Sequence, residues 1–145
     1  MSSRTLTVSD LLVELPTFTH KEGKLIIAEV RKISADMFLS APRVYWIVND
    51  TGKEIERGGH YHPEGGKKEI MVCLTGKANV ELHSKTFCTH VTLDSPKLGL
   101  LIPNMLWHKV LMFPGAILLC IASTEYHKEE CLTALPCNDQ GHQGT

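Results

Sequence analysis

The sequence has no large excess of charge of either sign. Its 15 Lys and Arg residues face 16 Asp and Glu residues, which gives a formal net charge of -1 at pH 7. A domain that holds a nucleic-acid backbone is normally basic, so the composition argues against nucleic acid as a partner. The composition is compatible with a single phosphorylated small molecule, because two or three local cations suffice to bind one.

Long apolar runs are also lacking. The longest, Ala116–Ala122, is much shorter than the roughly 20 residues that cross a bilayer. Residues 1–9 carry one Arg and no apolar stretch of the kind found in a signal peptide. We therefore expect a cytoplasmic protein that does not contact a membrane.

Cysteine is present, but not in a metal-binding or disulfide pattern. The five cysteines are odd in number and include no Cys-x-x-Cys pair, so neither a disulfide framework nor a zinc finger is predicted. Cys73, Cys88 and Cys120 lie in apolar or alternating runs, where cysteine packs as a small hydrophobic residue. This usage fits a reducing compartment.

The length of the chain predicts one domain. With 145 residues, 43% of them hydrophobic, the chain can bury a substantial core. We expect a single domain over residues 1–137, followed by a polar, disordered tail over residues 138–145.

Short apolar or alternating runs separated by turn residues predict a β-rich fold. In 77–83, Ala78, Val80 and Leu82 alternate with polar residues, which is the period of a strand with one buried face. Comparable runs predict strands at 24–30, 43–48, 69–74, 87–93, 99–102 and 116–122. Helical signals are confined to short turns at 9–15 and 123–132. The pattern indicates an all-β sandwich or small barrel and excludes a doubly wound α/β fold.

The densest polar cluster runs from Arg57 through Gly58 and Gly59 to His60 and His62. Two histidines at i and i+2 on a strand point to the same face and can converge on one substrate or one metal ion. A lone strand histidine is usually structural, but a pair preceded by Arg and two glycines favours a functional site. The glycines would let a substrate approach the backbone closely.

The histidine pair is followed, in order, by Glu69, Gly76, Pro103 and His108. This order resembles the two motifs of the cupin superfamily, in which two His, a Glu and a third His line a double-stranded β-helix. Six residues separate His62 from Glu69, more than metal-binding cupins usually have. Met105 stands where the second motif usually has Gly.

A closer resemblance, over about Lys24 to Leu132, is to the dTDP-sugar 3,4-ketoisomerase family of cupins. The matching stretches are Arg43-Val44-Tyr45, Arg57 to His62, Leu74-Thr75-Gly76, Leu93 to Pro96, Gly99-Leu100, Trp107-His108 and Ala122-Ser123, with Tyr126 nearby. The resemblance implies an all-β cupin jelly roll with short peripheral helical turns. It further implies a homodimeric isomerase that works without a metal or other cofactor. Family members convert a dTDP-4-keto-6-deoxyhexose into its 3-keto isomer, on the way to 3-amino sugars of surface glycans such as lipopolysaccharide.

The chemistry of this reaction suits the residues independently. Moving a ketone from C4 to C3 requires a base of near-neutral pKa for the C3 proton, and His is the natural choice. Donors to the enediolate oxygens could come from His62, Arg57 or Tyr45. By the resemblance, His60 matches the catalytic base and His62 the second active-site histidine. Arg43 and Arg57 match active-site arginines, and either could grip the diphosphate.

Four further residues are candidates for substrate binding. Trp107 could stack on thymine or sugar, although Trp in a small barrel is more often core. His108 would point into the barrel of a cupin. Tyr126 could reach a phosphate or the sugar, and Ser123 belongs to a matching stretch. Lys67 and Lys68 follow two glycines and are most simply a solvated turn.

The sequence departs from the family at four places. Glu22-Gly23 replaces an Arg-Gly pair that borders the sugar, which leaves the sugar and its C4 configuration open. Pro63 replaces a Lys and begins a longer loop, and Lys109 replaces an acidic residue. Glu69 replaces Gln and restores a full set of metal-type ligands.

Two other functions therefore stay open beside the ketoisomerase. One is a metal-dependent cupin enzyme that uses His60, His62, Glu69 and His108. The other is a non-catalytic cupin that binds a sugar or nucleotide. Arg57 beside the histidine pair favours an anionic ligand over a bare metal site, but excludes neither alternative.

Overall fold

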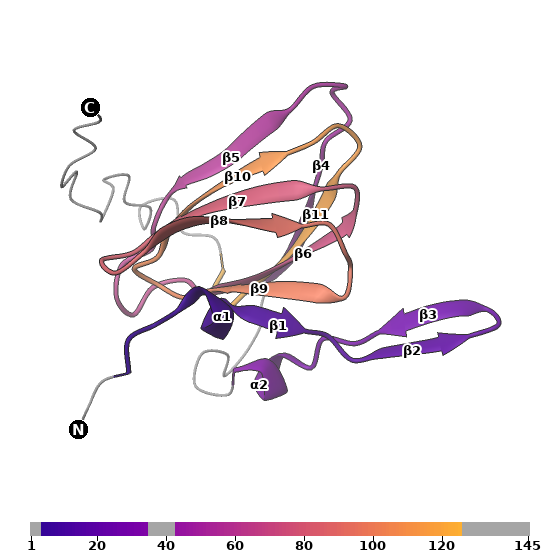
Figure 1. Ribbon diagram of the computed structural model, residues 1–145, viewed down its shortest axis with the longest axis horizontal. Helices are drawn as coiled ribbons and strands as arrows, with labels where there is room; N and C mark the ends of the chain where they lie inside the picture. The colour runs from indigo at the N-terminus through magenta and orange to yellow at the C-terminus, as the bar shows by residue number, and fades with distance from the viewer. Residues whose placement is uncertain (1–3, 35–42, 126–145) are drawn as a thin grey trace, which may run out of the picture.

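The computed structural model describes residues 4–34 and 43–125, which form two antiparallel sheets that face each other (Figure 1). The five-stranded sheet consists, in spatial order, of β1 (Leu12–Glu14), β9 (Leu98–Ile102), β6 (Glu69–Thr75), β11 (Ile117–Ala122) and β4 (Arg43–Val48). The four-stranded sheet consists of β5 (Ile55–His60), β10 (Trp107–Met112), β7 (Ala78–His83) and β8 (Cys88–Leu93). This arrangement confirms the all-β jelly roll predicted from the sequence.

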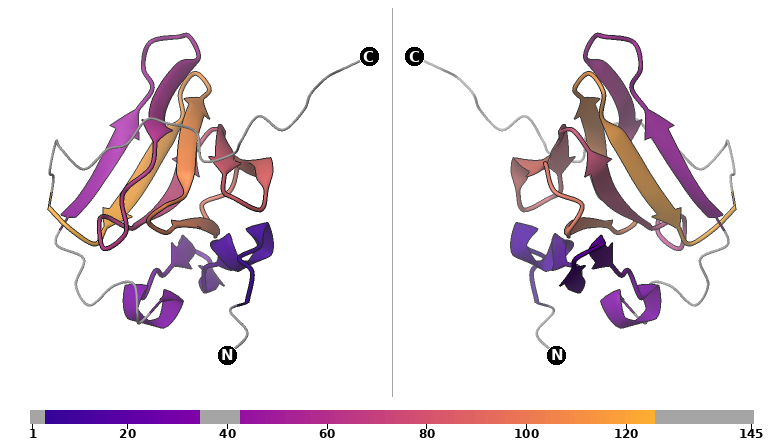
Figure 2. Two further views of the ribbon diagram at one scale, coloured as in Figure 1. Left: turned by 90° about the vertical axis from the view of Figure 1, so that its left-hand side faces the viewer. Right: turned by 90° about the vertical axis from the view of Figure 1, so that its right-hand side faces the viewer.

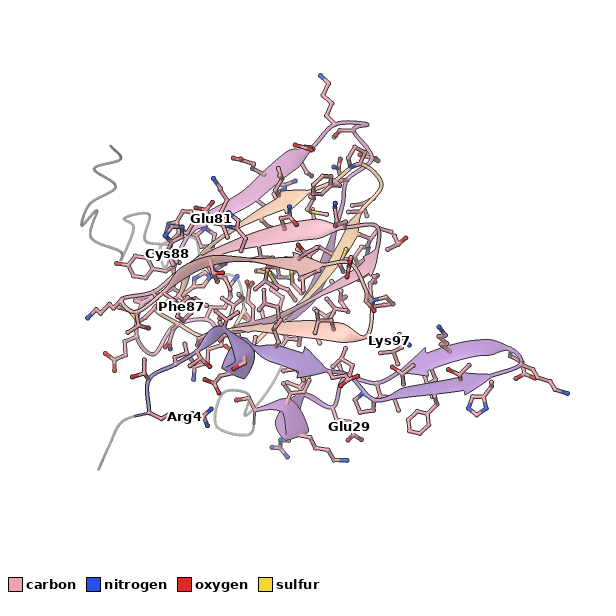
Figure 3. All side chains as sticks on the ribbon, in the orientation of Figure 1. Arg4, Glu29, Glu81, Phe87, Cys88 and Lys97 are labelled. Carbon is pink, nitrogen blue, oxygen red and sulfur yellow. The ribbon has the colours of Figure 1, made fainter. Side chains whose placement is uncertain are left out.

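A second group of elements lies beside the sheets. Helices α1 (Val8–Leu11) and α2 (Val30–Ile33) are one turn each, and β2 (Thr17–His20) pairs with β3 (Gly23–Ile26) in a two-stranded hairpin. The side views place these N-terminal elements along one side of the barrel (Figure 2). The hairpin extends away from both sheets (Figures 1 and 3). No helix within the described ranges is long and apolar enough to cross a membrane.

Alternation of side chains builds the core. On β7, Ala78, Val80 and Leu82 are buried while the residues between them are only partly covered, so the predicted period of two is confirmed. On β6 both faces are apolar. Met71 and Cys73 join the core between the sheets, whereas Ile70 and Val72 pack in a second cluster on the outer face. That outer cluster includes Leu15, Leu101 and Ile121, with the side of α2 packed against it.

Buried Asn49 closes one end of the barrel. Its side-chain amide donates to the carbonyls of Lys53 at 2.7 Å and of Met112 at 3.0 Å, and its carbonyl accepts from Thr51. The turn after β4 is therefore tied to the end of β10. This is the turn that Asn49 to Gly52 predicted.

Other expectations need correction. The strand expected at 24–30 ends at Ile26, because Ile27 then bonds the Pro16 carbonyl and α2 begins at Val30. The helical turn expected at 9–15 is α1, after which the chain continues as β1 and pairs with β9. The helix over 123–132 and the tail over 138–145 lie largely or wholly outside the described residues.

The cysteines behave in two ways. Cys73 and Cys120 are buried thiols, as the apolar runs around them predicted. Cys88 begins β8, where its side chain is exposed, and it is disulfide-bonded. The prediction that Cys88 packs as a small hydrophobic residue is wrong, because it occupies an outward position of the strand.

Candidate active site

A cavity of about 200 Å³ lies between the two sheets. It is bounded by β4, β6 and β11 of one sheet and by β5 and β10 of the other. Its base is apolar and includes Met71, Val110 and Leu118. Its polar lining brings together five residues singled out from the sequence, with Glu69 beside them: Arg43, Tyr45, Arg57, His60 and His108.

A bulge in β5 allows Arg57 and His60 to line the same cavity. Three positions apart on a regular strand, they would point to opposite faces of the sheet. The register between β5 and β10 shifts here, since His108 pairs with His60 while Lys109 pairs with Gly58, leaving Gly59 as an extra residue. This extra residue restores both side chains to one face.

The two glycines in the bulge have a backbone role. Both have φ of 82°, in the left-handed region that favours glycine. A Cβ on Gly58 would lie 2.9 Å from the carbonyl oxygen of His108. The sequence suggested that these glycines admit a substrate. Gly58 does line the cavity, but the close approach it permits is to the neighbouring strand.

Three histidines cluster at the wall of the cavity. The ring of His60 lies 5.0 Å from each of the rings of His62 and His108, and those two are 5.9 Å apart. His62 and His108 are only 2% exposed, while His60 is half-buried and faces the cavity. His108 Nδ1 donates to the Leu106 carbonyl at 3.0 Å, which leaves Nε2 as its unprotonated nitrogen. His60 is thus the member of the cluster that a substrate can reach.

The environment of His60 suits a base. Burial lowers its pKa below the ordinary 6.5, and the neighbouring His62 lowers that pKa further. Glu69 acts in the opposite direction but does not reverse the shift. Burial also lowers the pKa of His108. Both imidazoles are therefore neutral at pH 7, so His60 has a lone pair available for a proton.

Glu69 is held as a buried carboxylate. Its Oε1 accepts a hydrogen bond from the Tyr45 hydroxyl at 2.6 Å and lies 2.7 Å from Lys67 Nζ, while Oε2 is 3.9 Å from His108 Nε2. Burial alone would raise the pKa of Glu69, but Lys67 above all, together with the Tyr45 hydroxyl, lowers it overall. Burial raises the pKa of Tyr45, so its hydroxyl remains a donor.

Lys67 was missed by the sequence reasoning. Expected in a solvated turn, its side chain is only 13% exposed and lines the cavity. The signal was available, because Lys67 stands two residues before Glu69 and shares its side of the chain. Two preceding glycines obscured it by suggesting a loop exposed to solvent.

Ser123 and Trp107 are not among the residues that line the cavity. Ser123 anchors the loop before β6, since its hydroxyl accepts from Lys68 N at 2.9 Å and its own N–H donates to the Lys68 carbonyl at 3.0 Å. Trp107 precedes the inward-facing His108, so it points to the other face of its sheet. There its ring packs edge-on against His83, which bonds the Glu81 side chain labelled in Figure 3. Tyr126 lies outside the described residues.

Comparison with known proteins places this site in a family. The family model described as "FdtA: WxcM-like, C-terminal" matches residues 9–135. The chain belongs to this family. The match spans both sheets and every described residue of the cavity wall.

Individual relatives agree with this assignment. The chain is 31% identical over 118 residues, 81% of each chain, to the TDP-4-oxo-6-deoxy-alpha-D-glucose-3,4-oxoisomerase of Aneurinibacillus thermoaerophilus. The structure of the present chain resembles that of the sugar 3,4-ketoisomerase QdtA of Thermoanaerobacterium thermosaccharolyticum in complex with TDP. The TM-score is 0.74 and the identity 26%, over 85% of this chain and 86% of the other. The fold also resembles the RmlC epimerase of Mycobacterium tuberculosis, with a TM-score of 0.70 and 19% identity over 90% and 71% of the two chains.

The bulge yields a prediction for Gly58→Ala. An alanine there must adopt an unfavourable φ and also displace the His108 backbone, so we expect a loss of about 2–4 kcal/mol in the free energy of unfolding. Gly115→Ala is the matched control, because Gly115 has φ of 80° with nothing within 4 Å of its would-be Cβ. That variant should lose only about 1–2 kcal/mol, the cost of the backbone conformation. Denaturant unfolding measures both, and equal losses would contradict the role of the bulge.

Proposed function

We propose that this protein is a 3,4-ketoisomerase that moves the keto group of a dTDP-4-keto-6-deoxyhexose from C4 to C3. The observation that carries the proposal is the neutral, half-buried His60 facing a cavity lined by two arginines. Membership of the family and the printed activity of its 31% identical relative support the same reaction. The QdtA complex with TDP supports a thymidine diphosphate carrier.

The reaction moves two protons. His60 removes the proton on C3, which is acidic because it lies next to the C4 carbonyl, and an enediolate forms across C3 and C4. Return of a proton to C4, with loss of the proton on the C3 hydroxyl and gain of one by the C4 oxygen, completes the exchange. Arg57 lines the cavity as a donor for an enediolate oxygen, whereas the single hydroxyl proton of Tyr45 is already donated to Glu69. The buried His62 ring packs edge-on against His60.

The arginines suit the diphosphate. The Arg43 guanidinium lies over the Tyr45 ring, 4.5 Å from its centroid, which fixes its direction beside the cavity. Arg57 stands on the opposite sheet and is exposed at the cavity. Because the chain is close to neutral, attraction of the nucleotide depends on such local cations and not on a broad field.

A metal-dependent enzyme is the second candidate, and one observation favours it. Nitrogens of His60, His62 and His108 lie within 4.8 Å of one another, close enough to share one ion. The fourth member suggested by the sequence, Glu69, is engaged through Oε1 by Tyr45 and Lys67. A metal on this cluster would also occupy the lone pair that His60 needs as a base. We therefore rank this function below the isomerase.

We also propose that the protein is a homodimer. On the edge strand β4, the outward side chains Val44, Trp46 and Val48 are 53%, 65% and 48% exposed. The projecting β2–β3 hairpin exposes Phe18 and Leu25 as well. Exposed apolar rows on an edge strand favour association with a second copy.

The remaining proposals concern partners and location. We propose a cytoplasmic protein that binds neither nucleic acid nor membrane, because the substrate is a nucleotide-activated sugar and the net charge is near zero.

Turnover of TDP-4-keto-6-deoxyglucose, followed by NMR of the product, tests the isomerase. His60→Asn should lower kcat by at least about 100-fold, the usual scale for loss of a general base. Because the pKa of His60 lies below 6.5, the acid limb of kcat/KM should also fall below pH 6.5. His90→Asn, at an exposed position on β8, should leave turnover unchanged. A wild-type protein that binds dTDP without producing the 3-keto isomer would instead indicate a binding protein.

Chelation tests the metal-dependent alternative. We expect EDTA to leave isomerisation unchanged and added Zn²⁺ to inhibit it, because imidazole binds Zn²⁺ through the lone pair used for proton transfer. Turnover and elemental analysis provide the measurements. Activity lost to the chelator and restored by one divalent ion would establish the metal enzyme and overturn the proposed mechanism.

Sedimentation tests the homodimer. Trp46→Asp would place a charge where an apolar contact is proposed, so we expect a dimeric wild type and a shift of the variant toward monomer at micromolar concentration. Leu6→Asp, at another exposed apolar position away from β4 and the hairpin, is the control and should remain dimeric. A monomeric wild type would rule out the assembly.

A further inference from the structure

The ion pair of Lys67 with Glu69 lies at the cavity, and the proposed mechanism does not use it. Both side chains are largely withdrawn from water, at 13% and 2% exposed, with Nζ 2.7 Å from Oε1. Placing two charges in such a setting costs desolvation energy, and a buried pair is therefore weak evidence of a purely stabilising role. A buried cation that also faces a cavity is a candidate for contact with a ligand.

Two contacts fix the direction of Lys67. Lys68, the next residue, is bound through its backbone N–H and carbonyl to Ser123. On the other side, a turn closed by Gly66 N and the Pro63 carbonyl at 2.9 Å brings the chain back toward β6. The Lys67 side chain is therefore directed inward on the side of Glu69, where the carboxylate holds the ammonium in place.

The ammonium retains hydrogen-bonding capacity after it pairs with Glu69. It has three N–H donors, and the carboxylate contact through Oε1 takes one of them. The Tyr45 ring lies beside it, with Nζ 5.8 Å from the centroid. Its position at the cavity leaves the other donors available for a group bound there.

Proton abstraction from C3 places a negative charge on the C4 oxygen, and transfer of the C3 hydroxyl proton to that oxygen moves the charge to the C3 oxygen. A fixed cation in a site shielded from water stabilises such a charge more than it stabilises the neutral ketone. Among the described residues that line the cavity, the cationic side chains are Arg43, Arg57 and Lys67. In the proposed function Arg43 binds the diphosphate and Arg57 donates to one enediolate oxygen, which leaves Lys67 as the cation for the other oxygen.

We propose that Lys67 is a catalytic residue whose ammonium donates to the enediolate oxygen, and that Glu69 is the positioning residue that holds it there. This inference rests on the proposed ketoisomerase function. No proton is consumed by the contact: His60 carries the C3 proton to C4, while Lys67 stabilises the charge that exists between these two steps.

Three variants test the proposal with TDP-4-keto-6-deoxyglucose as substrate. Lys67→Met removes the charge at similar length and should lower kcat by about 10²–10³-fold, the scale for loss of one oxyanion donor. The Kd for dTDP, measured by calorimetry, should change by less than about threefold, because Arg43 and not Lys67 holds the diphosphate. Lys68→Met is the matched control, since Lys68 anchors the loop to Ser123 through its backbone and does not line the cavity, and it should turn over at the wild-type rate.

The double variant Lys67→Met/Glu69→Gln separates catalysis from charge balance. It removes both members of the pair, so it avoids the unpaired carboxylate that can destabilise the single variant. We expect it to fold, bind dTDP and remain as slow as Lys67→Met. Recovery of kcat to within threefold of wild type would show that Lys67 only neutralises Glu69, and would overturn the proposal.

Two other outcomes would also overturn it. A Lys67→Met variant within threefold of wild-type kcat would show that the ammonium does not contact the enediolate. A loss of dTDP affinity as large as the loss of kcat would make Lys67 a phosphate ligand. Inactivity of the wild type, in contrast, would overturn the ketoisomerase function itself, and this inference with it.

Discussion

The extra residue in β5 is the constraint on which the site depends. Without it, the alternation of a regular strand would direct Arg57 and His60 to opposite faces, one toward the cavity and one toward solvent. Gly58 and Gly59 supply the backbone conformation that the bulge requires. Between β5 and β10, the same register shift pairs His60 with His108. One local feature therefore assembles the proposed base, His60, with His108 and Arg57 at one wall.

Burial then sets the charges in that wall. The same removal from water that lowers the pKa of His60 and His108 would neutralise Glu69 if it stood alone. Lys67 reverses the outcome for the carboxylate because its ammonium is in direct contact. The result is a set of neutral imidazoles next to an ionised pair. The neutral imidazole of His60 and the ammonium of Lys67 therefore lie at the same cavity at neutral pH.

The sequence predicts most of the barrel and only part of the site. β4 has the bounds predicted for it, and β7, β8 and β11 differ by one residue. Alternation marks β7 and β8, and β-branched, aromatic or apolar runs between turn residues mark β4 and β11. The strand expected at 24–30 is shorter in the structure and ends at Ile26, since Ala28 and Val30 pack on the outer face of the large sheet instead of continuing the hairpin.

For three residues, Trp107, Lys67 and Ser123, the role predicted from the sequence differs from the position in the structure. Trp107 was expected near the ligand, although its position next to His108 on β10 already directs it to the opposite face. A glycine-rich turn precedes Lys67 and predicts exposure to solvent. Lys67 nevertheless lies two residues before the buried Glu69, and this spacing predicts side chains on the same, inward side. Ser123 holds this turn through contacts 55 residues apart in the sequence. Local patterns specify faces and periods, whereas such long-range backbone contacts appear only once the sheets are assembled.

The charges of the cavity also distinguish its two possible ligands. Three cationic side chains and one carboxylate line it, and the histidines are neutral. Such a lining attracts a diphosphate and stabilises an enediolate, while it repels a divalent cation approaching the histidine cluster. Glu69 would offset this repulsion for a metal, but its Oε1 is already committed to Tyr45 and Lys67. The substitution that gives the chain a complete set of metal-type residues is thus accompanied by a lysine that directs the carboxylate to another partner. The ligand types alone suggest a metal centre, but their hydrogen bonds favour an anionic substrate.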